Sequence, residues 1–230
     1  MSVTTLSQPH TEFRNADRRQ ESLLAGIEKV CLLRIARLLP PRVKPDHLTI
    51  LGFAAMFLAG ASYALARWWP PALLLVNLWL AVNWFGDSLD GTVARTRDCQ
   101  RPRFGFYVDH MVDSFGALFL IAGLAFSGYM SAWVAVALLL SFYLLSINSY
   151  LATYTLGTFQ LSFWKFSPTE MRILLAVGNA FALFRPTVTV LGMHQRFFDV
   201  SGAVAVVSMA VVLAASVTRN TLALYRMERL

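Results

Sequence analysis

Long apolar runs alternate with short polar or proline-containing breaks along most of the chain. A membrane-spanning helix needs about 20 mostly apolar residues. Six runs reach that length, at roughly 47–67, 71–94, 105–128, 131–156, 168–190 and 198–219. Several of the breaks contain proline or glycine, which are typical of turns. The pattern predicts an all-α integral membrane protein, built as a compact bundle of six transmembrane helices.

The segment before the first run has a different pattern. Residues 1–22 form a polar tail without the apolar core of a signal peptide. In residues 23–44, apolar positions recur at helical spacing against charged ones, so this segment is too charged to span a bilayer and too apolar for open water. We expect an interfacial amphipathic helix on the membrane; the alternative is an ordinary amphipathic helix packed on the bundle. Residues 45–230 then form the transmembrane domain.

Composition and charge agree with a membrane protein and suggest its orientation. Hydrophobic residues make up 57% of the chain and charged residues 14%, and the mean hydropathy is +0.54. With six spans, all but three of the 20 Lys and Arg residues fall on one side of the membrane. The positive-inside rule places both termini in the cytoplasm, most simply at a bacterial inner membrane. Anionic lipids account for the net charge of +7, so no nucleic-acid partner is expected.

Four aspartates flank the break between the second and third runs. If residues 96–104 join two antiparallel helices, Asp90 and Asp109 lie at nearly the same depth, and so do Asp87 and Asp113. The spacing within each helix, three and four residues, places each couple on one helix face. Small residues let membrane helices approach closely, and four of them lie on the same faces: Gly91, Ala94, Gly105 and Gly116. We expect all four carboxylates to converge in one narrow cleft.

Converging carboxylates resist leaving water, at roughly 2.5–3.5 kcal/mol each at the bilayer centre, so a cation must offset their charge. Hard oxygen ligands suit Mg²⁺ or Mn²⁺, as one ion or two, and an ion pair about 4 Å apart can clamp both oxygens of a phosphoryl transfer. Four arginines in and beside the predicted loop could pair with an anion such as a diphosphate; the alternative is an ordinary positive-inside loop. They are Arg95, Arg97, Arg101 and Arg103.

This stretch resembles the signature of the CDP-alcohol phosphotransferase family. The signature reads Asp-x-x-Asp-Gly-x-x-Ala-Arg, then eight or nine residues, then Gly-x-x-x-Asp-x-x-x-Asp. Its fixed positions are met by Asp87, Asp90, Gly91, Ala94, Arg95, Gly105, Asp109 and Asp113. The sequence PDHLTILG at 45–52 is similar to the Pro-Asn-x-Leu-Thr stretch that opens the first span in many members, with Asp46 in place of Asn. Pro45 and Thr49 could equally mark a helix start.

The resemblance implies an enzyme that transfers a substituted phosphate group from a CDP-alcohol, most simply CDP-diacylglycerol, to an acceptor alcohol. CMP is released and a phospholipid forms. By this analogy Asp87, Asp90 and Asp109 bind Mg²⁺ or Mn²⁺, while Asp113 shares the metal site and acts as general base. Gly91, Ala94 and Gly105 leave room for the nucleotide and phosphates, and Arg95 contacts phosphate. Family members are commonly homodimers, which implies the same here.

The acceptor side is less defined. Lys165 and Arg172 could hold the phosphate of a phosphorylated acceptor, or could belong to a positive-inside loop. In SPTE at 167–170, Glu170 completes a capping box with Ser167, and this interpretation is favoured over catalysis. SPTE also resembles a Gly-Pro-Thr-Glu stretch of aminoalcohol phosphotransferases, so transfer from CDP-choline or CDP-ethanolamine to diacylglycerol is an alternative.

A divalent-cation transporter is the rival from a different class, because intramembrane carboxylates are equally typical of transporters. Four guanidinium groups beside the entrance would repel a metal ion and attract a nucleotide diphosphate. The charge pattern therefore favours the transferase.

Overall fold

The computed structural model describes residues 17–19, 25–156, 158–160, 168–190 and 192–228. Helices make up most of this part of the chain: α1 (Ala25–Leu38), α2 (Pro45–Leu65), α3 (Ala72–Thr96), α4 (Pro102–Phe126), α5 (Ala132–Leu156), α6 (Pro168–Phe184) and α7 (Phe197–Met227). Two short strand pairs accompany them. β1 (Asp17–Arg19) runs parallel to β2 (Thr158–Gln160), and β3 (Thr187–Val190) pairs antiparallel with β4 (Met193–Arg196).

Five helices are long and apolar enough to cross a membrane: α2, α3, α4, α5 and α7. Their positions agree with five of the six predicted spans, and the chain is an integral membrane protein. The remaining prediction, a span over 168–190, is wrong at its end because α6 stops at Phe184 and residues 187–190 form β3. Pro186 lacks the N–H that would continue the helix and disfavours helical backbone at the residue before it. The β-branched sequence TVTV that follows favours a strand.

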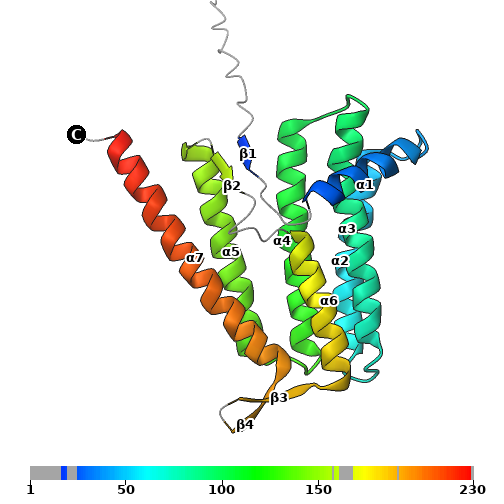
Figure 1. The fold of residues 1–230 in the computed structure, drawn as a ribbon, viewed down its shortest axis with the longest axis vertical. Helices are drawn as coiled ribbons and strands as arrows, with labels where there is room; N and C mark the ends of the chain where they lie inside the picture. The colour runs from blue at the N-terminus through cyan, green and yellow to red at the C-terminus, as the bar shows by residue number, and fades with distance from the viewer. Residues whose placement is uncertain (1–16, 20–24, 157, 161–167, 191, 229–230) are drawn as a thin grey trace, which may run out of the picture.

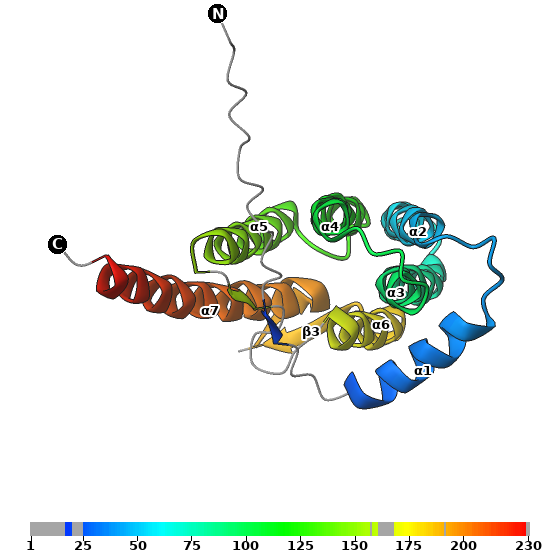
Figure 2. The same cartoon turned by 90° about the horizontal axis from the view of Figure 1, so that it is seen from above.

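Helix α2 holds the first half of the bundle together. It packs along both α3 and α4, while α1 and α6 pack against α3, α5 against α4, and α7 against α5 (Figure 2). The α3–α4 connection, α1 and the C-terminal end of α7 lie at one end of the molecule, and the β3–β4 hairpin lies at the other (Figure 1). We call these the connection end and the hairpin end. Helix α6 begins partway along α3 and runs to the hairpin end (Figure 1).

Glycines allow the backbone of α2 to touch its two neighbours. A Cβ atom on Gly123 of α4 would overlap the carbonyl oxygen of Gly60 on α2, and one on Gly60 would overlap the carbonyl of Phe119. A Cβ atom on Gly86 of α3 would likewise meet the backbone of Leu48 and Gly52. Contacts this close are typical of small-residue packing between membrane helices.

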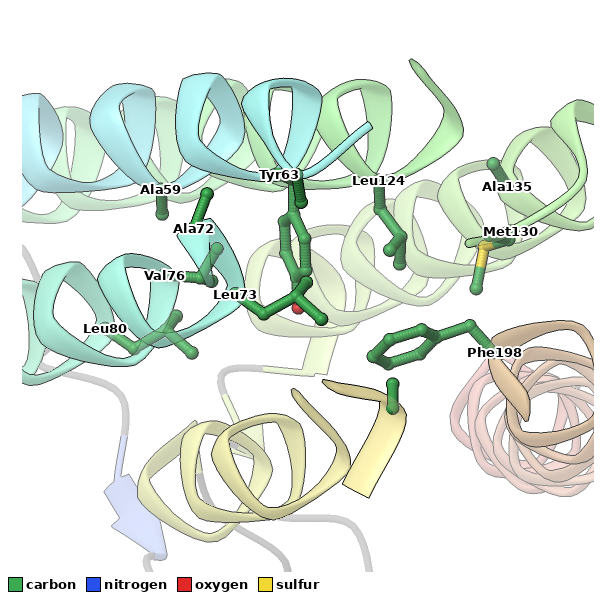
Figure 3. Close-up of a cluster of buried hydrophobic side chains, with 12 residues drawn as sticks. Ala59, Tyr63, Ala72, Leu73, Val76, Leu80, Leu124, Met130, Ala135 and Phe198 are labelled. Atoms are coloured by element: carbon green, nitrogen blue, oxygen red, sulfur yellow. The ribbon is translucent and has the colours of Figure 1, made fainter. Parts of the chain in front are cut away.

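The main apolar core lies toward the hairpin end and joins side chains from six helices (Figure 3). Tyr63, Leu73 and Val76 are among its fully buried members. One polar network crosses it: the Tyr63 hydroxyl donates to Asn179 Oδ1 at 2.7 Å, and Asn179 Nδ2 donates to Asn77 Oδ1 at 2.8 Å. Asn77 Nδ2 in turn donates to the carbonyl oxygen of Ala176 at 3.1 Å. The network ties α2, α3 and α6 together, which is how buried amides commonly stabilise membrane bundles.

A second, smaller apolar cluster lies at the connection end. Leu32 and Ala36 of α1 pack there with Leu48 of α2 and with Leu89 and Val93 of α3. The helix at 25–38 therefore packs on the bundle. This arrangement is the alternative that the sequence left open beside an interfacial helix. The opposite side of α1 remains exposed, with Leu38 83% accessible.

Candidate active site

The four aspartates lie on α3 and α4, near the connection end. At about 1.5 Å per residue, Asp90 and Asp109 are each about 10 Å from the connection between the two helices, and Asp87 and Asp113 are about 13 and 16 Å from it. Asp113 lies within electrostatic range of Asp87, Asp109 and Asp90, and of the guanidinium of Arg172. The structure thus brings the predicted carboxylates into one neighbourhood.

Asp90 is held by α2 and by its own helix. Its Oδ2 accepts a hydrogen bond from the Thr49 hydroxyl at 2.6 Å, and its Oδ1 accepts one from the Gly91 N–H at 2.5 Å. Thr49 lies in the first turns of α2, which begins at Pro45. The sequence PDHLTILG therefore does more than start a helix, because its threonine orients a carboxylate of the candidate site.

Asp87 pairs with an arginine from α6. Arg172 Nη2 lies 2.5 Å from Asp87 Oδ2, and both side chains are largely removed from solvent. Arg172 Nε donates to Asn83 Oδ1 at 2.8 Å, and Asn83 Nδ2 donates to the carbonyl oxygen of Gly52 at 3.0 Å. This chain joins α2, α3 and α6 beside the carboxylates, so Arg172 belongs to the site and its partner is one of the predicted metal ligands.

The arginines after Asp90 have different surroundings. Arg97 donates to three backbone carbonyls of the α1–α2 connection, those of Val43, Leu39 and Pro40, at 2.6–3.2 Å. Arg101 pairs with Asp46 at the start of α2 and lies over the ring of Phe104. Arg97 thus holds the α1–α2 connection, and Arg101 holds the start of α2. These contacts favour a structural role for both residues over anion binding.

Arg95 lies closer to the aspartates than Arg97 and Arg101 do. Its Nη2 donates to the Thr92 hydroxyl at 3.2 Å, and it lies within electrostatic range of Asp90. A Cβ atom on Gly91 would meet the Arg95 guanidinium at 3.2 Å. Gly91 therefore leaves the space that the guanidinium occupies beside the carboxylates.

The prediction that small residues bring α3 and α4 together is wrong. A Cβ atom on Gly105 would meet nothing within 4 Å, and one on Gly116 would meet Met56 of α2. The two helices are held instead by α2, which lies against both. Gly105 thus borders open space and Gly91 makes room for Arg95, so neither glycine forms a contact between α3 and α4. Ala94 is half-buried.

The donor chemistry of the site suits a divalent cation, since four carboxylates supply hard oxygen ligands. Within the described ranges no three His, Cys, Asp or Glu side chains are grouped closely enough to hold a metal ion. Asp87 is instead paired with a guanidinium, and both oxygens of Asp90 accept hydrogen bonds. A bound cation would have to draw the carboxylates closer than they lie here.

The other predicted acceptor residues are placed only in part. Lys165 and Ser167 lie outside the described residues, and so does the predicted capping box that depends on Ser167. Glu170 lies in the first turn of α6 and is buried.

Sequence reasoning missed two residues of this neighbourhood. Tyr150 of α5 packs edge-on against the ring of His110 and lies within electrostatic range of Asp113 and Asp109. Glu28 of α1 accepts hydrogen bonds from α3 and α6 next to Asp87 and Arg172. The sequence pattern contains no signal that either residue lies beside the aspartates.

A comparison with models of known protein families identifies the family of this chain. The family model described as CDP-alcohol phosphatidyltransferase matches residues 42–218, a range that contains all four aspartates, Thr49 and Arg172. A search of the curated proteins finds no match for the chain. The chain therefore belongs to the CDP-alcohol phosphatidyltransferase family, and it is a membrane-embedded transferase of substituted phosphate groups that acts on a CDP-alcohol donor and an alcohol acceptor.

Proposed function

We propose that the protein makes a phospholipid from CDP-diacylglycerol and an acceptor alcohol, releasing CMP in a reaction that requires Mg²⁺ or Mn²⁺. The observation that carries the proposal is the gathering of Asp87, Asp90, Asp109 and Asp113 around one neighbourhood that also contains Arg172. A carboxylate cluster with adjacent guanidinium groups suits a ligand that combines divalent cations with phosphates.

Asp87, Asp90 and Asp109 would hold the metal, with Asp113 sharing the site. When bound, the cation would neutralise charge on the diphosphate and on departing CMP. Thr49 keeps Asp90 oriented through its 2.6 Å hydrogen bond. The Arg172 guanidinium, now on Asp87, offsets part of the negative charge of the site.

Asp113 would act as the general base. In the transfer, the acceptor oxygen bonds to the phosphorus that carries the diacylglycerol, the bond from that phosphorus to CMP breaks, and the acceptor proton passes to Asp113. A base needs to lie within hydrogen-bond reach of that proton. Its position supports this role, because Asp113 lies within electrostatic range of the three aspartates proposed to hold the metal.

The remaining predicted residues would position the two substrates. Ala94 and Gly105 would leave space for the nucleotide. Gly91 makes room for the Arg95 guanidinium, which lies beside Asp90, where it could contact donor phosphate. Arg172, with Lys165, would bind the phosphate of a phosphorylated acceptor. Arg172 reaches the site from α6, whereas the signature residues lie on α3 and α4.

The membrane arrangement extends the proposal. Helix α6 has 17 residues, close to the lower limit for a span, and would complete six crossings together with the five long helices. Helix α1, which lies across the connection end with an exposed Leu38, would rest at the membrane interface. Positive-inside bias would place this end and both termini in a bacterial cytoplasm, and we propose a homodimer by analogy with the family.

CMP release by the purified protein in detergent tests the proposal. CDP-diacylglycerol would be offered with inositol phosphate, glycerol 3-phosphate, serine or inositol, and CDP-choline or CDP-ethanolamine with diacylglycerol. Mg²⁺, Mn²⁺ or EDTA would be present, and Asp113→Asn would serve as the inactive control. We expect release with CDP-diacylglycerol and one acceptor, abolished by EDTA and in the variant.

Three other results of this assay would each overturn part of the proposal. Release only from CDP-choline or CDP-ethanolamine would establish the aminoalcohol alternative and overturn our choice of donor. Release that persists in EDTA would contradict the metal requirement. Folded protein that is inactive with every pair but carries Mn²⁺ into liposomes would restore the transporter hypothesis.

A further inference from the structure

Helix α1 contributes one carboxylate to the inner side of the bundle. Glu28 Oε1 accepts hydrogen bonds from Trp84 Nε1 at 2.7 Å and from the Thr169 hydroxyl at 2.9 Å. The Ser88 hydroxyl lies 3.4 Å from the same oxygen. A single oxygen thus receives donors from α3 and from α6, two helices that are 81 residues apart between Ser88 and Thr169.

These donors flank the ion pair of the candidate site. Trp84 lies three residues before Asp87 on α3, and Thr169 lies three residues before Arg172 on α6. Residues three apart on a helix are surface neighbours. Glu28 therefore joins α3 to α6 about one helical turn from the place where Asp87 and Arg172 meet.

The contact with Glu28 fixes the start of α6 against α3. Helix α6 begins at Pro168, so Thr169 lies in its first turn, where a carboxylate is favoured by the partial positive charge of the helix N-terminus. Farther along α6, Arg172 and Asn179 donate hydrogen bonds to Asn83 and Asn77 of α3. A shift of the first turn would change where the long Arg172 side chain can reach.

We propose that Glu28 is a positioning residue of the active site, which holds the first turn of α6 against α3 so that Arg172 reaches the carboxylates. Helix α1 ends at Leu38, before the range that matches the family model begins at residue 42. The positioning contact is therefore supplied by a part of the chain outside that match. Its effect on substrate binding rests on the proposed function of Arg172; its effect on α6 does not.

A distance measurement tests the effect on α6 directly. Spin labels would be attached at Leu174→Cys on α6 and Ile50→Cys on α2, two exposed apolar positions, after replacing Cys31 and Cys99 with serine. In the full chain in detergent we expect one narrow distance distribution. Glu28→Ala should broaden or shift it, and Glu28→Gln should largely restore it, because the amide oxygen still accepts from Trp84 and Thr169. Lys29→Ala, the exposed neighbour on α1, is the matched control and should leave it unchanged.

Kinetics of CMP release separate positioning from a general loss of stability. Glu28→Ala should raise the acceptor KM by about 10-fold, the size of one charge-assisted hydrogen bond, and leave the donor KM unchanged. Thr169→Val should have the same effect, and the double variant should be no worse than either single one. An unchanged distance distribution, or equal increases in both KM values, would overturn the inference. If the wild-type protein releases no CMP at all, the proposed function fails and the distance measurement alone decides whether Glu28 positions α6.

Discussion

Two polar networks join the same three helices, and they differ in charge. Toward the hairpin end, Tyr63, Asn179 and Asn77 form a neutral chain of hydrogen bonds enclosed by the apolar core. Toward the connection end, Asn83, Arg172 and Asp87 form a charged chain next to three further aspartates. In the neutral network, each side chain hydrogen-bonds to another member, and Asn77 also donates to the Ala176 carbonyl. This network therefore needs no ligand. The charged one gathers more carboxylates than a structural role requires, which is expected where a protein binds a ligand at a cost in stability.

The largest effect is expected from Asp113→Asn. Loss of a general base should lower the rate of CMP release by about 10²–10⁴-fold. The variant should unfold in EDTA at a temperature no lower than the wild type, because it removes one of four mutually repelling carboxylates. Added Mg²⁺ should raise the melting temperature of the wild type more than that of the variant, since a ligand stabilises the state that binds it.

The control for this comparison lies at the other end of the molecule. Asp199, near the start of α7, accepts a hydrogen bond from the Ser131 N–H at 2.6 Å, and an asparagine oxygen can accept the same bond. Asp199→Asn should keep both the activity and the response to Mg²⁺. Equal responses of wild type and Asp113→Asn to Mg²⁺ would contradict a metal site that includes Asp113.

A large loss of stability without a specific loss of chemistry is expected from Gly123→Val. The added side chain would overlap the backbone carbonyl of Gly60, which cannot move aside as a flexible side chain can. Overpacking commonly costs about 1–3 kcal/mol of unfolding free energy, and a clash with backbone should fall at the upper end. Unfolding in mixed detergent micelles would measure it. Gly26→Ala, where a Cβ meets nothing within 4 Å, should not destabilise the protein; similar losses for both would mean that α2 and α4 are not held by this contact.

These helix contacts show where sequence reasoning stops. The signature spacing predicted similar depths for the four carboxylates, because two antiparallel helices with a short connection fix the depth of each residue. It did not predict that α2 lies between the partners, since membrane helices are apolar on most faces and hydropathy does not tell which face packs. Gly91 and Gly105 looked like contact residues for the same reason, whereas the contacts are made by Gly60, Gly86 and Gly123.

Partners of charged side chains were equally hard to predict. The chain shows the charge of Arg97 but not that three carbonyls of the α1–α2 connection accept its hydrogen bonds. Glu28 lies in a segment whose alternating pattern predicts only a helix with one polar face. Its three donors come from positions 56, 60 and 141 residues away, a distance at which pattern gives no guidance. The early end of α6, by contrast, could have been inferred from Pro186 and the strand-forming sequence TVTV.

A smaller effect is expected in the neutral network. Tyr63→Phe removes the hydroxyl that donates to Asn179 and changes little else. Interhelical hydrogen bonds in membrane proteins contribute about 0.6 kcal/mol on average, so a loss of that size in unfolding free energy is expected. CMP release per folded molecule should not change. Tyr225→Phe, on an exposed tyrosine, is the matched control and should affect neither quantity; a loss of activity in Tyr63→Phe at unchanged stability would show that the two networks are coupled.

The smallest effect is expected from Arg101→Gln, and it distinguishes tethering arginines from substrate-binding ones. Arg101 pairs with Asp46, and the two side chains are 52% and 47% exposed, so the pair should contribute about 0–1 kcal/mol and less at high salt. If its role is only to tether α2, the donor KM should stay at the wild-type value. Arg95→Gln, which changes a guanidinium within electrostatic range of Asp90, should raise the donor KM instead. The comparison uses the same substitution at two arginines six residues apart, measured by CMP release over a range of CDP-diacylglycerol concentrations. A rise in donor KM for both variants would mean that the whole arginine cluster faces the nucleotide. A rise for neither would mean that neither arginine contacts the donor, and that its negative charge is recognised by other groups of the proposed site, such as the metal and Arg172.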